Sequence, residues 1–179
     1  MKTILFVLRL ALTLLAITAV VAVALAGVNM ITAPAIAELN AQNTQAAIQA
    51  VLPGGGEELA EFPAVDLVSK VYASDSGYAV QVTPGGVDNT ITMMVGVDKS
   101  GNVLGIDVIS HTETAGLGAV SDADTPAGIA FREQFKGATG SVSVTKDGGQ
   151  MDAITGATIT SRAVCAGVNA ALECVAQMG

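Results

Sequence analysis

The sequence is poor in the residues that build most active sites and nucleic-acid surfaces. It has no tryptophan, 3% aromatic residues, one histidine and two cysteines, and eight lysines and arginines face sixteen aspartates and glutamates. The formal net charge of −8 argues against a nucleic-acid partner, because phosphate contacts need clustered basic side chains. The shortage of aromatic residues also leaves no platform on which bases could stack.

The sequence also has few residues that could bind a metal ion or form a disulfide. His111 has no histidine or cysteine partner at ligand spacing, so we expect a polar loop residue and no metal site. Cys165 and Cys174 lie nine residues apart on one predicted helix, on opposite faces and about 13 Å apart along the axis. That separation is too long for a disulfide, and two cysteines cannot hold an iron–sulfur cluster. We expect both to be small packing residues.

Motifs of common enzyme classes are missing as well. The sequence contains no Gly-x-Ser-x-Gly elbow, no Gly-x-Gly-x-x-Gly turn and no Walker lysine. We therefore assign no catalytic residue. A chain with so few acid–base groups suits an electron carrier, in which a cofactor supplies the chemistry and the protein binds and orients it.

What the sequence does have is a long apolar run at its N-terminus. Residues 10–37 carry no charge, and residues 4–28 exceed the roughly 20 apolar positions that cross a bilayer. Lys2 and Arg9 precede the run and acidic residues follow it, which predicts a single-pass protein of the inner membrane with a cytoplasmic N-terminus and an extracytoplasmic domain. A signal peptide cleaved near residues 24–26 is the alternative, although the run is longer than a usual signal core.

The remaining pattern predicts an α+β fold, in which one transmembrane helix precedes an antiparallel-sheet domain with flanking helices. Pro34 is expected to start a connecting helix that ends before a glycine-rich joint. Strands are expected over 68–73, 78–83, 90–97 and 103–110, and a second hairpin between 141–145 and 151–154. Helices are expected over 125–135 and, after the stretch 152–161, through to residue 176. The expected division is a membrane anchor (1–30), a connecting helix and joint (31–58) and a folded domain (59–179).

The stretch from Asp152 to Ser161, Asp-Ala-Ile-Thr-Gly-Ala-Thr-Ile-Thr-Ser, is the most informative. It delivers the Thr158 hydroxyl close to a helix N-terminus, where free N–H groups and the helix dipole attract a phosphate. A hydroxyl beside such a cradle suits a phosphoester link. The alternative is that Thr158, Thr160 and Ser161 simply compete to cap the helix.

The pattern Asp-x-x-Thr-Gly-Ala-Thr at 152–158 resembles the flavinylation motif of the FMN-binding domain family. That family includes the G subunit of the Rnf complex and the C subunit of the sodium-pumping NADH:quinone reductase. Its last motif threonine carries FMN through the 5′-phosphate, attached by a flavin transferase that uses FAD. The resemblance implies covalent FMN on Thr158, with Thr155 as the next candidate acceptor, and places around the cofactor Asp152, Thr155, Gly156, Ala157, Ile159, Thr160 and Ser161.

A second segment, His-Thr-Glu-Thr-Ala-Gly-Leu-Gly at 111–118, resembles the Glu-Thr-Pro-Gly-Leu-Gly loop of the same family, which lies against the flavin. Ala115 replaces the usual proline and loosens the expected turn. Taken without the family, the segment is a glycine-punctuated turn after a strand. The resemblance implies flavin contacts from Glu113, Thr114, Gly116, Leu117 and Gly118.

The length and the immediate anchor are more similar to the Rnf G subunit than to the longer quinone-reductase subunit. The resemblance therefore implies an electron-transfer subunit of a membrane complex that couples ferredoxin oxidation and NAD+ reduction to Na+ or H+ translocation. Its implied partners are the membrane, other membrane, flavin or iron–sulfur subunits, and a flavin transferase for maturation. The alternatives are the quinone-reductase subunit, an anchored flavoprotein of extracellular electron transfer, and an anchored module without a cofactor.

Overall fold

The computed structural model describes residues 2–87 and 89–178 and divides the chain into two units, which meet between Gln42 and Asn43. Helix α1 (Lys2–Val51) forms the first unit and continues into the second. The segment Phe6–Val51 includes a window of mean hydropathy 2.5 that is not buried within the protein. By length and composition this helix can cross a membrane, a test that a signal sequence in this position also passes.

The expected new helix start at Pro34 is wrong, because Pro34 lies inside the continuous helix α1. A proline within a helix removes one backbone hydrogen bond and costs about 3 kcal/mol. Here it is flanked by Ala33, Ala35 and Ala37, and alanine is the strongest helix former. The apolar run and the connecting segment therefore form one helix rather than two.

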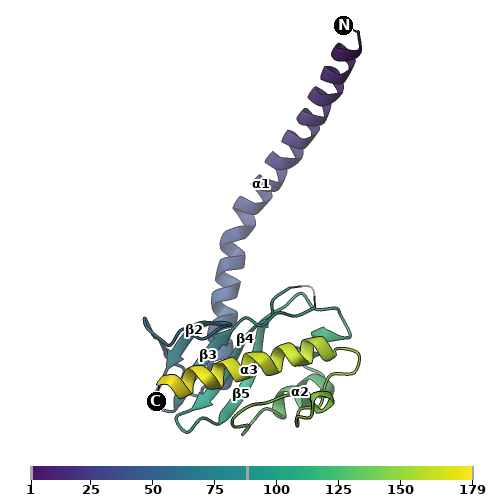
Figure 1. The fold of residues 1–179 in the computed structure, drawn as a ribbon. Coiled ribbons are helices and arrows are strands. Elements are labelled where there is room, and N and C mark those ends of the chain that lie inside the picture. Colours follow the sequence, from purple (N-terminus) through teal and green to yellow (C-terminus); the bar gives the residue numbers. More distant parts are fainter. Residues whose placement is uncertain (1, 88, 179) are drawn as a thin grey trace. The chain divides into compact units, whose positions relative to one another are not determined.

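The second unit is built on a five-stranded antiparallel sheet in sequential order, β1 to β5. Strands β2 to β5 are labelled in Figure 1. The four longer strands agree with the sequence prediction to within two residues, and β1 was not predicted. The strands are β1 (Glu57–Glu58), β2 (Val68–Ala73), β3 (Gly77–Val82), β4 (Thr92–Asp98) and β5 (Val103–Ser110). The expected α+β class with an antiparallel sheet is confirmed.

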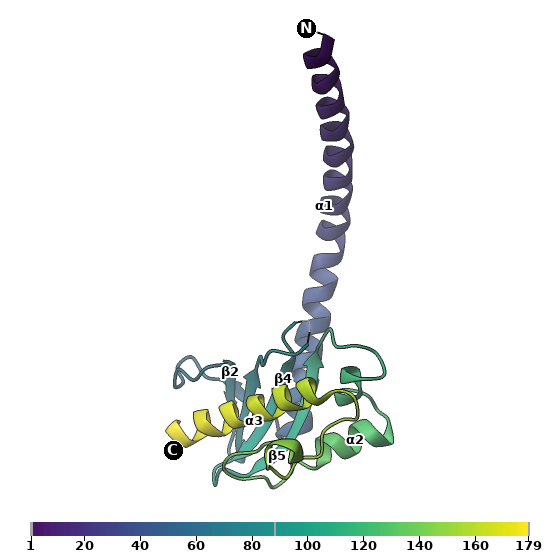
Figure 2. The same ribbon diagram turned by 45° about the vertical axis from the view of Figure 1, so that its right-hand side comes forward.

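Helix α3 (Thr158–Met178) crosses one face of this sheet, as both ribbon views show (Figures 1 and 2). Its buried side chains, among them Val164 and Val168, share a core with strand residues such as Val80 and Val95. The opposite face is covered by the end of α1, where Ile48 and neighbouring residues pack against β2, β3 and β4. Strand β4 is buried at its five central positions because both faces of the sheet are covered.

Helix α2 (Pro126–Glu133) begins where the sequence predicts, with proline in its first turn and Thr125 as its N-cap. The Gly128 N–H donates to Thr125 Oγ1 over 3.3 Å. The rings of Phe131 and Phe135 meet edge to face, with centroids 5.5 Å apart. This short helix is thereby fixed against the core ahead of the flavinylation-like motif.

The expected hairpin between 141–145 and 151–154 is wrong. A short 3₁₀ helix, η2 (Thr145–Asp147), occupies the turn, and only Val144 and Met151 form a bridge, in parallel orientation. The Asn169 side chain takes both backbone groups of Val142, accepting from its N–H (2.8 Å) and donating to its carbonyl (2.9 Å). Those groups are then unavailable for a strand ladder.

Candidate functional site

The motif loop is held in shape by bonds between its own residues and the first turns of α3. Gly156 has φ +78°, a left-handed conformation that other residues rarely adopt. The buried Ser161 hydroxyl donates to the Ala157 carbonyl over 2.9 Å and accepts from the Ile154 N–H over 3.0 Å. Ser161 therefore fixes the loop rather than facing solvent.

Thr158 is the first residue of α3, and its side chain is only partly buried. Its Oγ1 accepts a hydrogen bond of 3.0 Å from the Nζ of Lys146, which lies in η2. Thr155, the second candidate acceptor, is exposed on the same loop. The hydroxyl that the sequence singles out is thus accessible and already in contact with a cation.

Thr160 is oriented inward. Its hydroxyl donates to Glu113 Oε2, and the other carboxylate oxygen of Glu113 accepts from the Val87 N–H over 2.9 Å. Glu113 is 7% exposed, so this carboxylate joins three segments of chain beneath the surface. The two predicted segments, 111–118 and 152–161, are therefore linked directly by a buried hydrogen bond.

Two glycines make room for this carboxylate. A Cβ on Gly118 would lie 2.6 Å from Thr160 Oγ1 and closer still to Glu113, and a Cβ on Gly86 would collide with the other carboxylate oxygen. Gly118 thus faces the buried link rather than an open surface. Gly116, in contrast, has φ +75° with open space around it.

A groove of about 460 Å³ opens between the two predicted segments and α2. The 3₁₀ helix η1 (Gly118–Ser121) contributes Val120 to its wall. The lining is mostly apolar and consists of Gly116, Val120, Ala127, Ala130, Phe131, Gln134, Asp152, Ala153, Ile154 and Thr155. The Leu117 side chain lies close to the motif loop, because a Cβ built on Gly156 would be only 2.9 Å from Leu117 Cδ2.

Gln134 holds the beginning of the motif. Its side-chain amide donates to the Asp152 carbonyl over 3.1 Å and accepts from the Asp152 N–H over 2.7 Å. Both backbone groups of Asp152 are thereby satisfied, while its carboxylate remains exposed. The sequence interpretation missed this role of Gln134, since a single glutamine on a helix carries no pattern that points to a distant loop.

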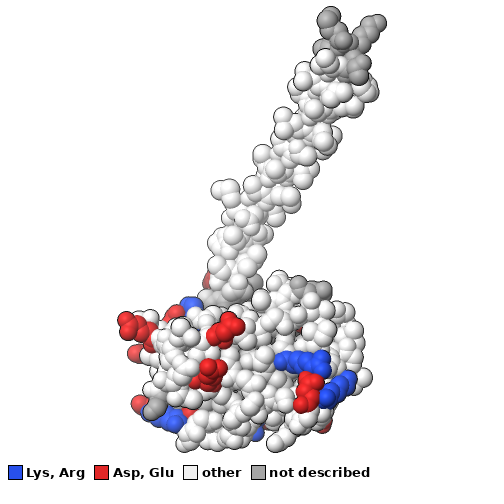
Figure 3. Space-filling view, in the orientation of Figure 1, with Lys and Arg blue, Asp and Glu red and all other residues white. Residues whose placement is uncertain are grey.

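Charged groups gather at the start of α3. Asp147 receives two hydrogen bonds from Arg162, of 2.6 and 2.7 Å. These bonds lower the pKa of Asp147 below its usual value and raise the pKa of Arg162. Figure 3 shows basic and acidic side chains together over this end of the helix, which agrees with the pair and the adjacent Lys146. The sequence interpretation missed Lys146, although it comes shortly before the motif.

The other predicted site residues lie at the surface of the same region. Thr114 and Leu117 are exposed on the 111–118 loop, and Ile159 is 56% exposed beside Thr158. Ala157 is buried under the motif loop. His111 accepts from the Glu113 N–H over 3.2 Å and so supports the loop. Among residues 2–87 and 89–178, no group of three or more potential metal ligands occurs, and Cys165 and Cys174 are free and buried.

The residues of this region fit a bound FMN. The groove offers apolar walls of the kind that enclose a ring system, and the exposed edge of the motif offers a hydroxyl, a lysine and the start of a helix. Lys146 and Thr158 could hold the phosphate end, and the groove residues could hold the ring. Among the described residues that line the groove, Asp152 is the only titratable one.

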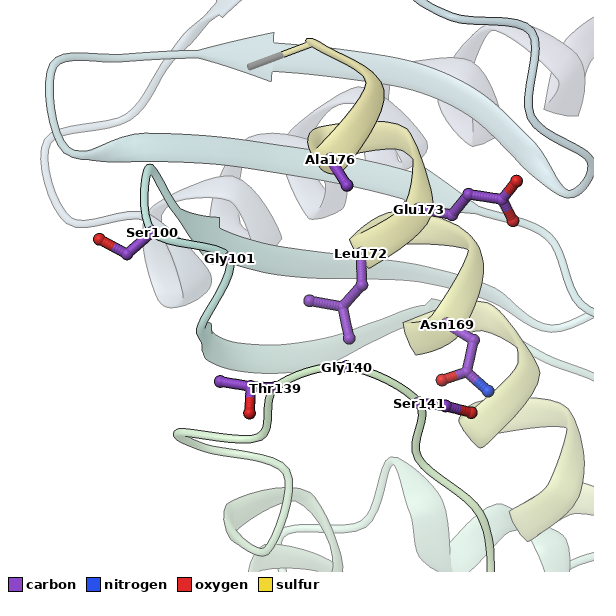
Figure 4. A pocket seen from close by; sticks show the side chains of 9 residues that line it. All are labelled: Ser100, Gly101, Thr139, Gly140, Ser141, Asn169, Leu172, Glu173 and Ala176. Carbon is purple, nitrogen blue, oxygen red and sulfur yellow. The ribbon is translucent and has the colours of Figure 1, made fainter.

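A second groove, of about 550 Å³, lies toward the other end of α3 (Figure 4). Leu172 extends toward the opening, and Asn169 and Glu173 lie on the same helix (Figure 4). The remaining walls come from the turn at Ser100 and the segment 139–141. None of the predicted site residues lines this groove.

Comparisons with known proteins identify the family to which the chain is similar. Residues 86–173 match the sequence profile of the FMN-binding domain family and include the two motif segments, the groove and Lys146. The G subunit of the Na(+)-translocating ferredoxin:NAD(+) oxidoreductase complex of Acetobacterium woodii is 35% identical, over 93% of this chain and 90% of that protein.

Two further relatives match over a shorter length. The G subunit of the ion-translocating oxidoreductase complex of Vibrio vulnificus is 42% identical over 52% of this chain and 46% of its own length. The G subunit of the proton-translocating ferredoxin:NAD(+) oxidoreductase complex of Clostridium ljungdahlii is 38% identical over 57% of each chain. The chain thus matches only about half the length of these two relatives.

Proposed function

The chain belongs to the family of FMN-binding G subunits of ion-translocating oxidoreductase complexes, and on that premise we propose that it is an electron-transfer subunit with one FMN joined covalently to Thr158. The complex would couple ferredoxin oxidation and NAD+ reduction to Na+ or H+ translocation, as the names of the relatives state for their own complexes. The observation that carries the proposal is the partly exposed Thr158 hydroxyl, in contact with Lys146 at the start of α3.

Bound FMN supplies the redox chemistry, and the residues of this chain bind, orient and shield it. The helix N-terminus and Lys146 provide positive potential for the phosphate. Gly156 and Ala157 keep the loop thin, and the Ser161 hydroxyl fixes its course. Contacts with the ring are assigned to the groove and to the 111–118 loop, while Glu113 and Thr160 brace that loop from below.

Covalent attachment can be tested on the full chain, produced together with a flavin transferase. A denaturing gel viewed under ultraviolet light should show a fluorescent band, because only covalently bound flavin survives denaturation. Mass spectrometry of the peptide around residue 158 should show the added mass of FMN on Thr158. A folded protein without fluorescence would instead support the anchored module in which Thr158 only belongs to the first turn of the helix.

The membrane part of the proposal rests on the apolar helix and its flanking charges. We propose an anchor within residues 1–30, a connecting segment over 31–58 and an FMN-binding domain over 59–179 on the extracytoplasmic side of the inner membrane. A reporter fused after the last residue should be active only outside the cytoplasm. Activity in the cytoplasm would contradict this orientation without affecting the flavin assignment.

The partners follow from the same premise. We propose that other membrane, flavin and iron–sulfur subunits bind this chain and that a flavin transferase matures it. Mild solubilisation and affinity purification should recover such subunits with ferredoxin:NAD+ oxidoreductase activity. Recovery with a quinone-reducing complex, or of the flavoprotein alone, would favour the quinone-reductase subunit or an independent extracellular carrier.

A further inference from the structure

The turn that carries Lys146 is fastened to α3. Asp147 binds Arg162 through two hydrogen bonds, and Arg162 follows Thr158 by four residues, so both lie on one face of the helix. Backbone bonds close the turn itself, from Asp147 N to the Val144 carbonyl (2.9 Å) and from Thr145 N to the Met151 carbonyl (2.9 Å). Lys146 is therefore exposed at its tip but carried by a fixed backbone.

Two basic residues at this point, Arg162 and Lys146, have different partners. Arg162 is bound by Asp147, whereas the Lys146 ammonium donates to Thr158 Oγ1 over 3.0 Å. An ammonium that donates to this oxygen leaves the hydroxyl proton free to depart. It also lowers the energy of negative charge that develops at the oxygen or on a phosphate joined to it.

From this geometry we propose that Lys146 is a positioning residue for flavin attachment, which orients Thr158 Oγ1 and stabilises the phosphate that becomes bound there. The inference rests on the proposed function. In the transfer, an Oγ1–P bond forms to the phosphorus that carries riboflavin, and the P–O bond to the adenylate half of FAD breaks. AMP leaves with the bonding electron pair, the hydroxyl proton passes to the transferase or to solvent, and no electron is gained or lost.

The test measures attachment to the flavin-free full chain in detergent, with purified flavin transferase and FAD. Initial rates come from fluorescence on denaturing gels, and the site comes from peptide mass spectrometry. Lys146→Met should lower the kcat of attachment about ten- to a hundredfold, the range expected for one hydrogen bond to a charged group. Lys146→Arg should keep a substantial part of the rate, since it retains a positive donor.

Lys99→Met is the matched control. Lys99 lies next to Ser100, which lines the groove toward the other end of α3, and a helix of 21 residues is about 30 Å long. This variant should attach flavin at the parental rate, and both methionine variants should melt at the parental temperature. Lys146→Cys should be slow and should recover after treatment with 2-bromoethylamine, which rebuilds an ammonium on a side chain of similar length. The parent is treated in parallel, with Cys165 and Cys174 buried.

Several outcomes overturn the inference alone. They are a parental kcat in Lys146→Met, a raised KM for the chain with unchanged kcat, and failure of the aminoethylated cysteine to recover. A raised KM would mean that the lysine is a contact for the transferase. Absence of FMN from the parent, or FMN on a residue other than Thr158, overturns the proposed attachment site and this inference with it.

Discussion

Two grooves of similar size, about 460 and 550 Å³, lie toward the two ends of α3, but the chemistry around them differs. The beginning of the helix has free N–H groups, a partly exposed hydroxyl and a lysine bound to it. Toward the other end the groove is lined by Leu172, Glu173 and Ala176 (Figure 4). A carboxylate near a helix C-terminus repels a phosphate, so the larger groove is the less suitable one.

The packing around glycines also differs between the two ends of α3. At the beginning of α3, Gly118 and Gly156 have neighbours so close that a Cβ would collide with Glu113, Thr160 or Leu117. At the other groove, a Cβ on Gly101 or Gly140 would meet nothing within 4 Å. The two predicted segments near the first groove are joined by the buried hydrogen bond from Thr160 to Glu113. Local bracing and charge, rather than groove volume, therefore distinguish the candidate site.

The largest expected difference between the two ends of α3 is in covalent flavin content after a hydroxyl is removed at each. Thr158→Ala should abolish covalent flavin, because it deletes the acceptor oxygen, while the loss of fold stability should be at most about 1 kcal/mol. Thr158→Ser should retain some attachment. Ser141→Ala, in the other groove, should bind flavin as the parent does. Intact mass spectrometry decides, and FMN on Thr158→Ala would move the acceptor to Thr155 or elsewhere.

The next largest difference concerns the glycines. Gly118→Ala should lower the free energy of unfolding by about 3 kcal/mol, because its Cβ would press on the buried Glu113–Thr160 link. Gly140→Ala should cost about 1 kcal/mol, since only its left-handed backbone (φ +68°) resists alanine. Urea unfolding of both variants measures the gap. Equal losses would mean that the 111–118 loop adjusts freely and that the first groove is not braced.

The parts of the fold that local pattern determines could be predicted from the sequence. Strands β2 and β5 begin and end where alternating apolar residues indicate, and Thr125 and Pro126 mark the start of α2. The continuation of α1 through Pro34 and the lack of a hairpin after Ser141 could not be predicted. A proline is tolerated among good helix formers, and the Asn169 side chain, distant in sequence, takes the backbone bonds that a hairpin needs.

The candidate site shows the same limit. The order of residues at 152–158 and 111–118 indicated both loops, and the structure brings them to one groove. The sequence could not indicate that the Glu113 carboxylate is buried beneath the loop, or that Gln134 and Lys146 bind the motif. These contacts join residues 12 to 47 positions apart, and a single sequence contains no signal for such pairs.

A smaller difference is expected between the stability losses that follow replacement of two glutamates, one near each groove. Glu113→Gln should lower the free energy of unfolding by about 1–2 kcal/mol, because it removes the negative charge that strengthens the hydrogen bonds from the Val87 N–H and the Thr160 hydroxyl. Glu173→Gln, exposed at the other groove, should change it by less than about 0.5 kcal/mol. A Glu113/Thr160 double-mutant cycle with Thr160→Val should give a coupling energy, and zero coupling would contradict the brace.

The smallest expected difference between the two ends lies on the buried side of α3, at its cysteines. Burial raises the pKa of Cys165 to about 11 and also raises the pKa of Cys174. At pH 8 a thiol with a pKa near 11 is about 0.1% thiolate, roughly a hundredfold less than one with the unfolded value near 9. Iodoacetamide should therefore label both cysteines far more slowly in the folded protein than in guanidinium chloride.

The pH dependence has a defined sign. The folded protein keeps the Cys165 proton that the unfolded chain loses above about pH 9, so this contribution to stability is complete below pH 9 and disappears as the pH rises toward 11. Peptide mapping of labelled protein at pH 8 measures each thiol separately. Fast labelling of Cys174 alone would show that the C-terminal turns of α3 open readily, and the contrast between the two ends would then extend to the helix itself. Equally slow labelling of both thiols would confine the contrast between the two ends to the loops and to the side chains that face solvent.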